Sequence, residues 1–456
     1  MPAGRGDAAP ETGPHPVPGR DTRALAPAAQ GGRTPRVRAR LLPPRPRLPH
    51  ALPRLLLPPR PQPGDCGVGH RLRGRRPAGD GRRRAGPLHV LGGWPVTGPT
   101  VLFAWRRTPP PLLIGGAEVS QQLLAEEFVR AGWRVVYLGS HEAPWNGSAQ
   151  IGHLRAHLRA HGTVWEEASG EVRYQWNGVS CRAVPQDRVE ATLKGLLAEA
   201  RPELVVTSQE RAADLAALAR RSSRVAGWLH SVSANSMGVL HGRPHVALAT
   251  SEFVAGRAQA HADTKAIVFY PPFAPAEGAE PLLPAGRGAA GRIPGGVLMV
   301  NPIPAKGAAL LHQLIRRLPT LRFTLVEGWW DTAGEFTAYP NVHWVPRTYA
   351  MGPIYAANDL LLVPSQVEDA FPRVIVEAGL HGVPTIGSSR GGIPEAVRDG
   401  GIIVHLDDVD AWVQAIETAE RAGLGAKALA GAAPLVRPCL PELAAAGLIP
   451  AAAAAC

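Results

Sequence analysis

Two acidic residues with seven residues between them, Asp369 and Glu377, could do chemistry together. Carboxylates at this spacing can each accept hydrogen bonds from the hydroxyls of a sugar or a ribose. The same segment predicts a helix that begins near Phe371, and a helix N-terminus presents free N–H groups to a diphosphate. The segment therefore predicts a site for a ligand that carries both phosphate and hydroxyl groups.

Two further loops fit such a ligand. Lys306 lies where a strand turns into a helix, and because the helix dipole disfavours a cation there, a phosphate partner is expected. Gly391 and Gly392 precede Ile393-Pro394-Glu395, and two glycines let the backbone approach a ligand closely. For Glu395 itself, a ligand contact and a structural cap are equally acceptable interpretations.

A metal site is not expected. Asp408 and Asp410 match a spacing that holds a metal in another class of sugar transferases, but they open the final predicted helix, where acidic residues cap the N–H groups. The four cysteines are far apart and form no CxxC pair, so neither a zinc module nor a disulfide framework is indicated. We expect no cofactor.

The elements that must position these residues form two α/β domains. Alternating strand and helix patterns predict a first Rossmann-like domain over 99–272 and a second over 297–424, joined by a linker at 273–296. Each domain is expected to be doubly wound around a parallel sheet, with the ligand in the cleft between them at the carboxyl ends of the strands. The last segment, 425–456, is rich in Ala, Gly and Pro, and we expect a tail there instead of a packed helix.

The charge is concentrated at one end of the chain. Residues 1–100 hold eighteen arginines, no lysine and five acidic residues, whereas the remainder holds 31 basic and 32 acidic residues and is nearly neutral. A basic globular nucleic-acid binder is therefore largely excluded, although a nucleic-acid role of the basic tail alone stays open. Residues 1–98 are rich in Pro, Arg and Gly and predict either a disordered extension or sequence that is foreign to the native protein.

The segment 359–404 also resembles a known family. It is similar to the donor-binding domain of GT-B glycosyltransferases, specifically the retaining family 4. That family has two acids with this spacing followed by a GGxPE loop. Asn301 to Gly307 is similar to the family's strand-to-helix loop, whose lysine binds the donor diphosphate, and Gly115-Gly116 is similar to its first glycine loop.

The resemblance implies transfer of a sugar, with retention, from a UDP- or GDP-linked donor to a glycan, lipid-linked or small-molecule acceptor, without a metal. It implies Lys306, Asp369 and His230 as catalytic residues. It also implies a donor-binding set, which comprises Gly115, Gly116, Asn301, Glu368, Phe371, Arg373, Val374, Glu377, Gly391, Gly392 and Glu395.

Three positions depart from the family pattern. Asp369 stands where the first acid is usually Glu, Pro372 replaces a glycine after Phe371, and Asn301 stands near the place of an arginine whose charge Arg373 could supply. They motivate an alternative, a catalytically impaired GT-B-like protein that binds nucleotide sugars. No window of 18 or more residues is apolar enough to span a bilayer. With the glycosyltransferase hypothesis we also expect a cytoplasmic protein. Peripheral contact with the inner membrane face stays open, as does the oligomeric state.

Overall fold

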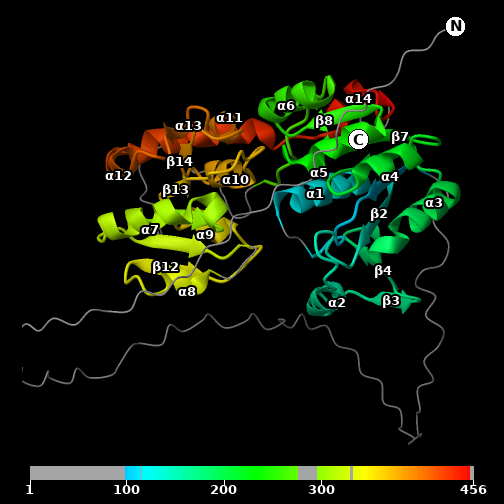
Figure 1. Cartoon of the computed structure of the whole chain (residues 1–456), viewed down its shortest axis with the longest axis horizontal. Coiled ribbons are helices and arrows are strands. Elements are labelled where there is room, and N and C mark those ends of the chain that lie inside the picture. Colours follow the sequence, from blue (N-terminus) through cyan, green and yellow to red (C-terminus); the bar gives the residue numbers. More distant parts are fainter. Residues whose placement is uncertain (1–97, 113–114, 276–294, 329–331, 452–456) are drawn as a thin grey trace, which may run out of the picture. The chain divides into compact units, whose positions relative to one another are not determined.

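The computed structural model describes residues 98–112, 115–275, 295–328 and 332–451. The predictions for the N-terminal extension and for most of the linker lie outside these residues. Within them, both expected α/β domains are present (Figure 1).

The first domain is built on a nine-stranded sheet with the order β3-β4-β5-β2-β1-β6-β7-β8-β9. From β5 to β9 all neighbouring strands are parallel, and β3, β4 and β5 pair antiparallel at one edge. The strands are β1 (Thr100–Ala104), β2 (Arg134–Ser140), β3 (Trp165–Ala168), β4 (Glu171–Trp176), β5 (Val179–Val184), β6 (Leu204–Thr207), β7 (Arg224–Leu229), β8 (Val246–Ala249) and β9 (Ile267–Val268).

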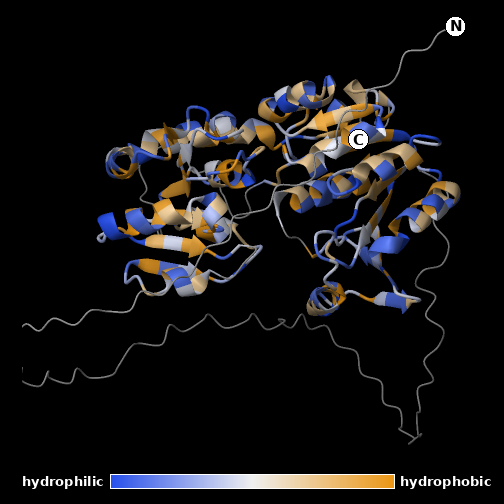
Figure 2. Cartoon of the chain, viewed as in Figure 1, coloured by the Kyte–Doolittle hydropathy of each residue, from blue (hydrophilic) through white to orange (hydrophobic). Residues whose placement is uncertain are grey.

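Alternation along the central strand assigns its side chains to the two faces of this sheet. Val101 and Phe103 of β1 belong to one buried cluster, and Leu102 and Ala104 belong to the other. A strand buried on both faces reads as a continuous apolar run, which is why β1 could be predicted. Figure 2 shows strands coloured mainly as hydrophobic and helices with mixed colours, as expected for helices that cover a sheet.

The connections of the first domain are mostly helical. They are α1 (Gly116–Arg130), α2 (Ile151–Ala160), η1 (Gln186–Arg188), α3 (Val189–Ala200), α4 (Ala212–Ala219), α5 (Ala234–Met237), η2 (Gly238–Gly242) and α6 (Glu252–Ala262). The loops at the carboxyl ends of three parallel strands, β1, β6 and β7, contribute residues to the candidate site.

The second domain has a six-stranded, all-parallel sheet with the order β12-β11-β10-β13-β14-β15. Numbered from its first strand this is 3-2-1-4-5-6, the order of dinucleotide-binding Rossmann sheets. Its elements are β10 (Val297–Val300), η3 (Pro304–Lys306), α7 (Ala308–Arg317), β11 (Phe323–Val326), α8 (Ala333–Phe336), β12 (Val342–Val345), α9 (Gly352–Ala356), β13 (Leu360–Val363), α10 (Arg373–Leu380), β14 (Thr385–Ser388), α11 (Ile393–Val397), β15 (Gly401–Val404) and α12 (Val409–Thr418).

The C-terminal segment is helical and packed, so the prediction of an Ala/Gly/Pro-rich tail is wrong within its described part. It contains α13 (Arg421–Ala432), η4 (Ala433–Leu435) and α14 (Leu440–Ala445). Small residues, which suggested a tail, instead allow close helix packing. A Cβ atom on Gly425 would lie 2.4 Å from the carbonyl oxygen of Gly382, and one on Gly400 would lie 2.4 Å from Ala428 Cα.

The last helix of this segment packs on the first domain. Leu440 and Leu443 of α14, with Leu448 and Ile449 beyond it, are buried in the same cluster as Phe103 and Trp228 of the first domain. Figure 1 shows α14 close to β7 and β8. No helix among the described residues is long and apolar enough to cross a membrane.

Candidate active site

The central polar pair of the site lies at the switch point of the second sheet. There, the loop after β10 carries Lys306 and the loop after the neighbouring strand β13 carries Asp369. Lys306 Nζ donates a hydrogen bond to Asp369 Oδ1 within an ion pair. Ligands of doubly wound sheets bind at such a point, because the two loops diverge there and leave a crevice.

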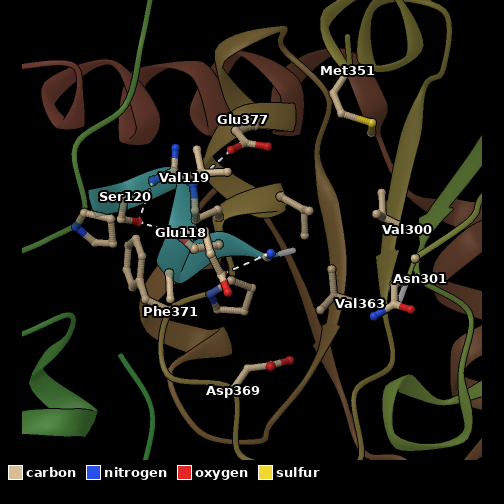
Figure 3. Close-up of a pocket in the computed structure, with 18 of the residues that line it drawn as sticks. Glu118, Val119, Ser120, Val300, Asn301, Met351, Val363, Asp369, Phe371 and Glu377 are labelled. Atoms are coloured by element: carbon tan, nitrogen blue, oxygen red, sulfur yellow. Dashed lines mark hydrogen bonds and ion pairs between the residues drawn. The ribbon is translucent and has the colours of Figure 1, made fainter. Parts of the chain in front are cut away.

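A cavity of about 1240 Å³ opens at this point. Loops of both domains line it, which agrees with the predicted cleft. Most of the predicted site residues are among its lining, namely Gly115, Gly116, His230, Asn301, Lys306, Glu368, Asp369, Phe371, Arg373, Val374 and Glu377. Figure 3 shows Asp369 and Glu377 well apart in this cavity, with Asn301 across from them.

Asp369 keeps one carboxylate oxygen for a ligand. Its Oδ1 is bound to Lys306, whereas its buried Oδ2 has no hydrogen-bond partner among the residues that the structure describes. A buried acceptor without a partner is costly, and a ligand hydroxyl would remove that cost. The pair thus offers an ammonium group to a phosphate and a carboxylate oxygen to a sugar hydroxyl.

Glu377 is held from two sides. The Tyr355 hydroxyl donates to Glu377 Oε2 at 2.9 Å, and Arg373 Nε donates to Glu377 Oε1 at 3.2 Å. Burial and the Glu377 charge raise the pKa of Tyr355 well above its usual value, so its hydroxyl remains a donor. These contacts fix the carboxylate at the wall of the cavity.

Arg373 links the second domain to the first. Its Nη1 donates to Ser120 Oγ at 3.0 Å and to the Pro272 carbonyl at 2.8 Å, and its guanidinium lies 4.3 Å from the Phe273 ring centroid. Burial lowers the pKa of Arg373, against the opposing effect of Glu377. The predicted second positive charge is therefore present at the cavity but already makes contacts between the domains.

Asn301 lies in a strained turn at the end of β10. It adopts a left-handed conformation with φ of 59°, and its carbonyl accepts a hydrogen bond from Ile303 N at 2.8 Å. Its buried Oδ1 has no hydrogen-bond partner within the described ranges of the chain. A Cβ atom on Gly328 would lie 1.9 Å from this oxygen, so only glycine fits beside the Asn301 carboxamide.

The helix N-terminus predicted near Phe371 begins two residues later. Helix α10 starts at Arg373, with Pro372 as its N-cap residue. The proline nitrogen could not donate in any case, and the N–H groups of Arg373 and Val374 are the first that the helix leaves without an intrahelical acceptor. Phe371 packs on Tyr270, with ring centroids 5.1 Å apart.

His230 follows β7 and lines the cavity from the first domain. Its Nε2 is buried and has no hydrogen-bond partner in the described part of the chain, and its ring centroid lies 4.3 Å from that of Trp228. Burial, with the charges of Arg107 and Arg373, lowers the pKa of His230 to about 3. The imidazole is therefore neutral at physiological pH, and its Nε2 can donate a hydrogen bond to a ligand or accept one from it.

Gly115 and Gly116 stand at the start of α1. Gly115 N donates to Glu118 Oε2 at 3.1 Å. A Cβ atom on Gly116 would lie 3.0 Å from Arg373 Cδ, so the second glycine leaves room for the arginine of the opposite domain.

Three predicted donor-binding residues are not part of the cavity lining. Gly391 has φ of 57°, and a Cβ atom there would lie 2.3 Å from the Asp369 carbonyl; at Gly392 it would lie 2.0 Å from the Ala370 carbonyl. The two glycines therefore admit the chain's own backbone instead of a ligand, and Gly392 N donates to the Asp369 carbonyl at 2.6 Å.

Glu395 is a cap, the second of its two interpretations. Its Oε1 accepts from Glu252 N and from the Tyr270 hydroxyl, each at 2.8 Å, and its Oε2 accepts from Phe253 N at 3.2 Å. It therefore caps α6 of the first domain.

Glu368 lines the cavity, but its carboxylate is engaged elsewhere. Arg257 Nη2, from α6, donates to both carboxylate oxygens at 2.5 Å. Glu368 therefore pairs with the first domain and is not an unpaired substitute for Asp369.

Sequence reasoning missed the charged cluster of the first domain. Arg107 binds Glu118 Oε1 at 2.8 Å and both oxygens of Glu210, at 3.1 and 2.7 Å, and all three residues line the cavity. The sequence could have indicated this cluster, because Arg107 follows β1 and Glu210 follows β6. These are the two strands at the switch point of the first sheet.

In the described parts of the chain, no group of three or more His, Cys, Asp or Glu residues comes together in a way that could hold a metal ion. Asp408 caps α12 as expected, because its carboxylate accepts from Ala411 N at 2.9 Å. The predicted capping role is confirmed.

Solved structures identify the class of this fold. The chain is similar to Anabaena Alr3699/HepE in complex with UDP and glucose, with a TM-score of 0.56, 17% identity, and coverage of 75% of this chain and 99% of that one. It is also similar to sucrose-phosphate synthase from Thermosynechococcus elongatus, with a TM-score of 0.56, 16% identity, and coverage of 77% and 97%. The chain therefore has the GT-B glycosyltransferase fold.

Residues 298–420, which make up most of the second domain, match the family model described as Glycosyl transferases group 1. A curated relative, D-inositol 3-phosphate glycosyltransferase of Mycobacterium marinum, is 31% identical over 140 residues, which cover 27% of this chain and 30% of the relative. The chain thus spans under a third of the length of this relative.

Proposed function

We propose that the protein is a retaining glycosyltransferase of the family 4 type. It moves a hexose from a UDP- or GDP-linked donor to a hydroxyl group of a glycan, a lipid-linked sugar or a small molecule, without a metal. The observation that carries this proposal is the Lys306–Asp369 ion pair at the switch point of a domain that matches the Glycosyl transferases group 1 model. One of the similar structures is named as a complex with UDP and glucose, which supports a sugar nucleotide as the donor.

In the proposed reaction the bond between the anomeric carbon and the diphosphate oxygen breaks, and its electron pair leaves with the diphosphate. The acceptor oxygen bonds to the same carbon on the same face, and its proton passes to the departing diphosphate oxygen. Positive charge develops on the sugar and negative charge on the leaving group. Preorganised donors aimed at that oxygen would lower the barrier.

The residues divide this work between them. Lys306, whose ammonium group has more than one N–H, would bind the diphosphate together with the first N–H groups of α10. Asp369 Oδ2 would accept from a sugar hydroxyl, and Glu377 would accept from the ribose. Neutral His230 would contact the transferred sugar from the first domain. The cytoplasmic location and a peripheral contact with the inner membrane face stay predictions.

The test is a transfer assay with the full chain and a panel of UDP- and GDP-hexoses against mixed glycans and small polyols. NMR of the product should show the anomeric configuration of the donor. Lys306→Ala should lower kcat/KM by about 10²–10³, the range found when one donor to a developing oxyanion is removed. Lys194→Ala, at an exposed lysine of α3, is the control and should keep full activity.

Two results would count against this proposal. Inversion of configuration would refute the retaining mechanism, and full activity of Lys306→Ala would refute the role of the lysine. Nucleotide binding without transfer or donor hydrolysis would favour a GT-B-like binding protein.

A further inference from the structure

The switch point of the first sheet carries a charged cluster that mirrors the pair in the second sheet. Arg107 follows β1, Glu210 follows β6, and these strands are neighbours in the centre of the sheet. Glu118 from α1 completes the cluster, which we call the first-domain cluster. Because ligands of doubly wound sheets bind at this point, the cluster marks where the first domain meets its own ligand.

The first-domain cluster has an excess of negative charge. Two carboxylates surround one guanidinium, and the three side chains are 2%, 12% and 19% exposed for Glu118, Glu210 and Arg107. Among the described first-domain residues that line the cavity, these three are the ones with a formal charge, since His230 is neutral near pH 7. This wall therefore carries a net charge of −1.

The arginine is committed to its own carboxylates. Nε and Nη2 of Arg107 both donate to Glu210 in a bidentate arrangement, and Nη1 donates to Glu118. Bidentate arginine pairs are the geometry by which proteins bind phosphate, and here a carboxylate already occupies that geometry. A phosphate monoester at this wall would have to displace Glu210 and would lie beside two carboxylates.

The backbone holds Glu210 in place. Its neighbours Gln209 and Arg211 both adopt left-handed conformations, with φ of 65° and 51°. Such conformations are unfavourable for residues other than glycine and persist where the surrounding structure requires them. The strained turn directs Glu210 toward Arg107, so the pairing is built into the loop.

The rest of the wall suits hydroxyl groups. His230 Nε2 and Thr250 Oγ1 are buried and without partners in the described structure, and both residues line the cavity. Neutral groups of this kind can donate to or accept from a hydroxyl.

We propose that the acceptor group bound at the first-domain cluster is an uncharged polyol, a sugar or cyclitol without a phosphate. This inference rests on the proposed glycosyl transfer and names its acceptor class. It separates the chain from the relatives named for D-inositol 3-phosphate, which it matches over less than a third of their length.

The experiment compares two matched pairs of probes, myo-inositol with D-inositol 3-phosphate and glucose with glucose 1-phosphate. Each is titrated into the full chain, with and without a saturating nucleoside diphosphate, while thermal unfolding is followed. The native chain should gain no stability from either phosphorylated probe beyond that from its unphosphorylated partner. Glu210→Ala should gain at least about tenfold in affinity for the phosphorylated probes, because it frees the Nε and Nη2 donors of Arg107 for a bidentate contact.

Controls separate charge from folding and from the proposed function. Arg107→Ala combined with Glu210→Ala should lose the gained affinity, and Glu203→Ala, at an exposed glutamate before β6, should not gain any. A native chain that binds or glycosylates the phosphorylated probe better than its unphosphorylated partner would overturn the inference. So would a folded Glu210→Ala variant with unchanged phosphate affinity. Nucleotide stabilisation is read without any acceptor, so a failure of the donor site is recognised separately.

Discussion

An ion pair lies at the switch point of each sheet. The two pairs differ in the polar groups that remain available to a ligand. In the second domain Lys306 pairs with one carboxylate and Asp369 retains an oxygen without a partner. In the first domain Arg107 is surrounded by two carboxylates. At the scale of single residues, we therefore expect the second domain to present a cation to a phosphate and the first to present hydrogen-bonding groups to hydroxyls.

Much of this residue chemistry was predictable from the sequence. The lysine loop and the two acids were visible because their types and spacing are local features. The partners of Glu395 and Glu368 were not, because Glu252, Phe253 and Arg257 lie more than a hundred residues away and only the fold brings them together. A carboxylate in a glycine loop looks the same in the sequence whether it binds a ligand or caps a distant helix.

His230 makes stability depend on pH. The folded chain holds its pKa at about 3 against an ordinary 6.5, so between these values the unfolded chain binds a proton that the folded chain does not. The contribution of neutral His230 to the free energy of unfolding is complete above pH 6.5. It is lost as the pH falls, by at most about 1.4 kcal/mol per pH unit.

Replacement of the imidazole tests this linkage. His230→Gln should lose less unfolding free energy than the native chain between pH 6.5 and pH 5, measured by denaturant unfolding at each pH. His343→Gln, at an exposed histidine of β12, should follow the native chain. Parallel curves for the native chain and His230→Gln would show that the buried neutral histidine is not the source of the dependence.

At the scale of elements, two helices are capped by carboxylates from distant segments. Glu395 after β14 caps α6 of the first domain, and Glu127 of α1 accepts from Cys439 N and Leu440 N at the start of α14, at 2.6 and 3.0 Å. A carboxylate satisfies the free N–H groups of a helix and complements its dipole. These caps therefore act as contacts between separate parts of the chain.

Helix α6 also holds the segment that carries Asp369. Ser251 Oγ donates to the Ala370 carbonyl at 2.7 Å, and Arg257 binds Glu368, so contacts from the first domain flank Asp369 on both sides. Gly392 N binds the Asp369 carbonyl from the opposite direction. The position of Asp369 thus depends on α6 and its N-cap residue Ser251.

Glu395→Gln should weaken this arrangement. The amide nitrogen of the glutamine would face a hydrogen-bond donor, where the carboxylate now presents an acceptor oxygen. We expect a loss of about 1–3 kcal/mol in unfolding free energy. We also expect a higher KM for the sugar nucleotide with a smaller change in kcat, because Glu395 positions Asp369 and does not touch the substrate.

The matched control is Glu417→Gln, at an exposed glutamate of α12, which should change neither quantity. A Glu395→Gln variant that loses stability but keeps the native KM would assign the residue to folding alone.

The elements themselves were predicted unevenly. The buried strands of both sheets were recognisable because their apolar runs are continuous. The β3-β4-β5 edge was missed, although Val172 and Tyr174 alternate with Arg173 and Asn177-Gly178 forms the turn between β4 and β5. Both residues of that turn have positive φ, the conformation that such a dipeptide favours. Here the signal was present in the sequence, unlike the partners of Glu395.

At the scale of the whole molecule, the C-terminal segment belongs to both domains. Helix α13 packs on the second domain, and α14 contributes Cys439, Leu440 and Leu443 to the main core of the first. Composition alone pointed to a tail, because alanine and glycine dominate. The buried leucines are few, and their destination is fixed only by the fold.

Leu443→Ala tests this return of the chain. Leu443 is fully buried, so the substitution should cost about 2–5 kcal/mol in unfolding free energy. Ala445→Ser, at an exposed position of the same helix, should cost far less. Denaturant unfolding would measure both, and equal stabilities of the two variants would mean that α14 does not pack into the first domain.

The most direct test of the central claim is nucleotide binding by the folded chain. UDP, GDP and ADP would each be added to the full chain and to Lys306→Ala while thermal unfolding is followed. We predict that one diphosphate stabilises the native chain, by about 2.7 kcal/mol at a concentration 100 times its Kd, and stabilises Lys306→Ala much less. A folded native chain that none of the three stabilises, or equal stabilisation of the variant, would contradict a donor site built on Lys306 and Asp369.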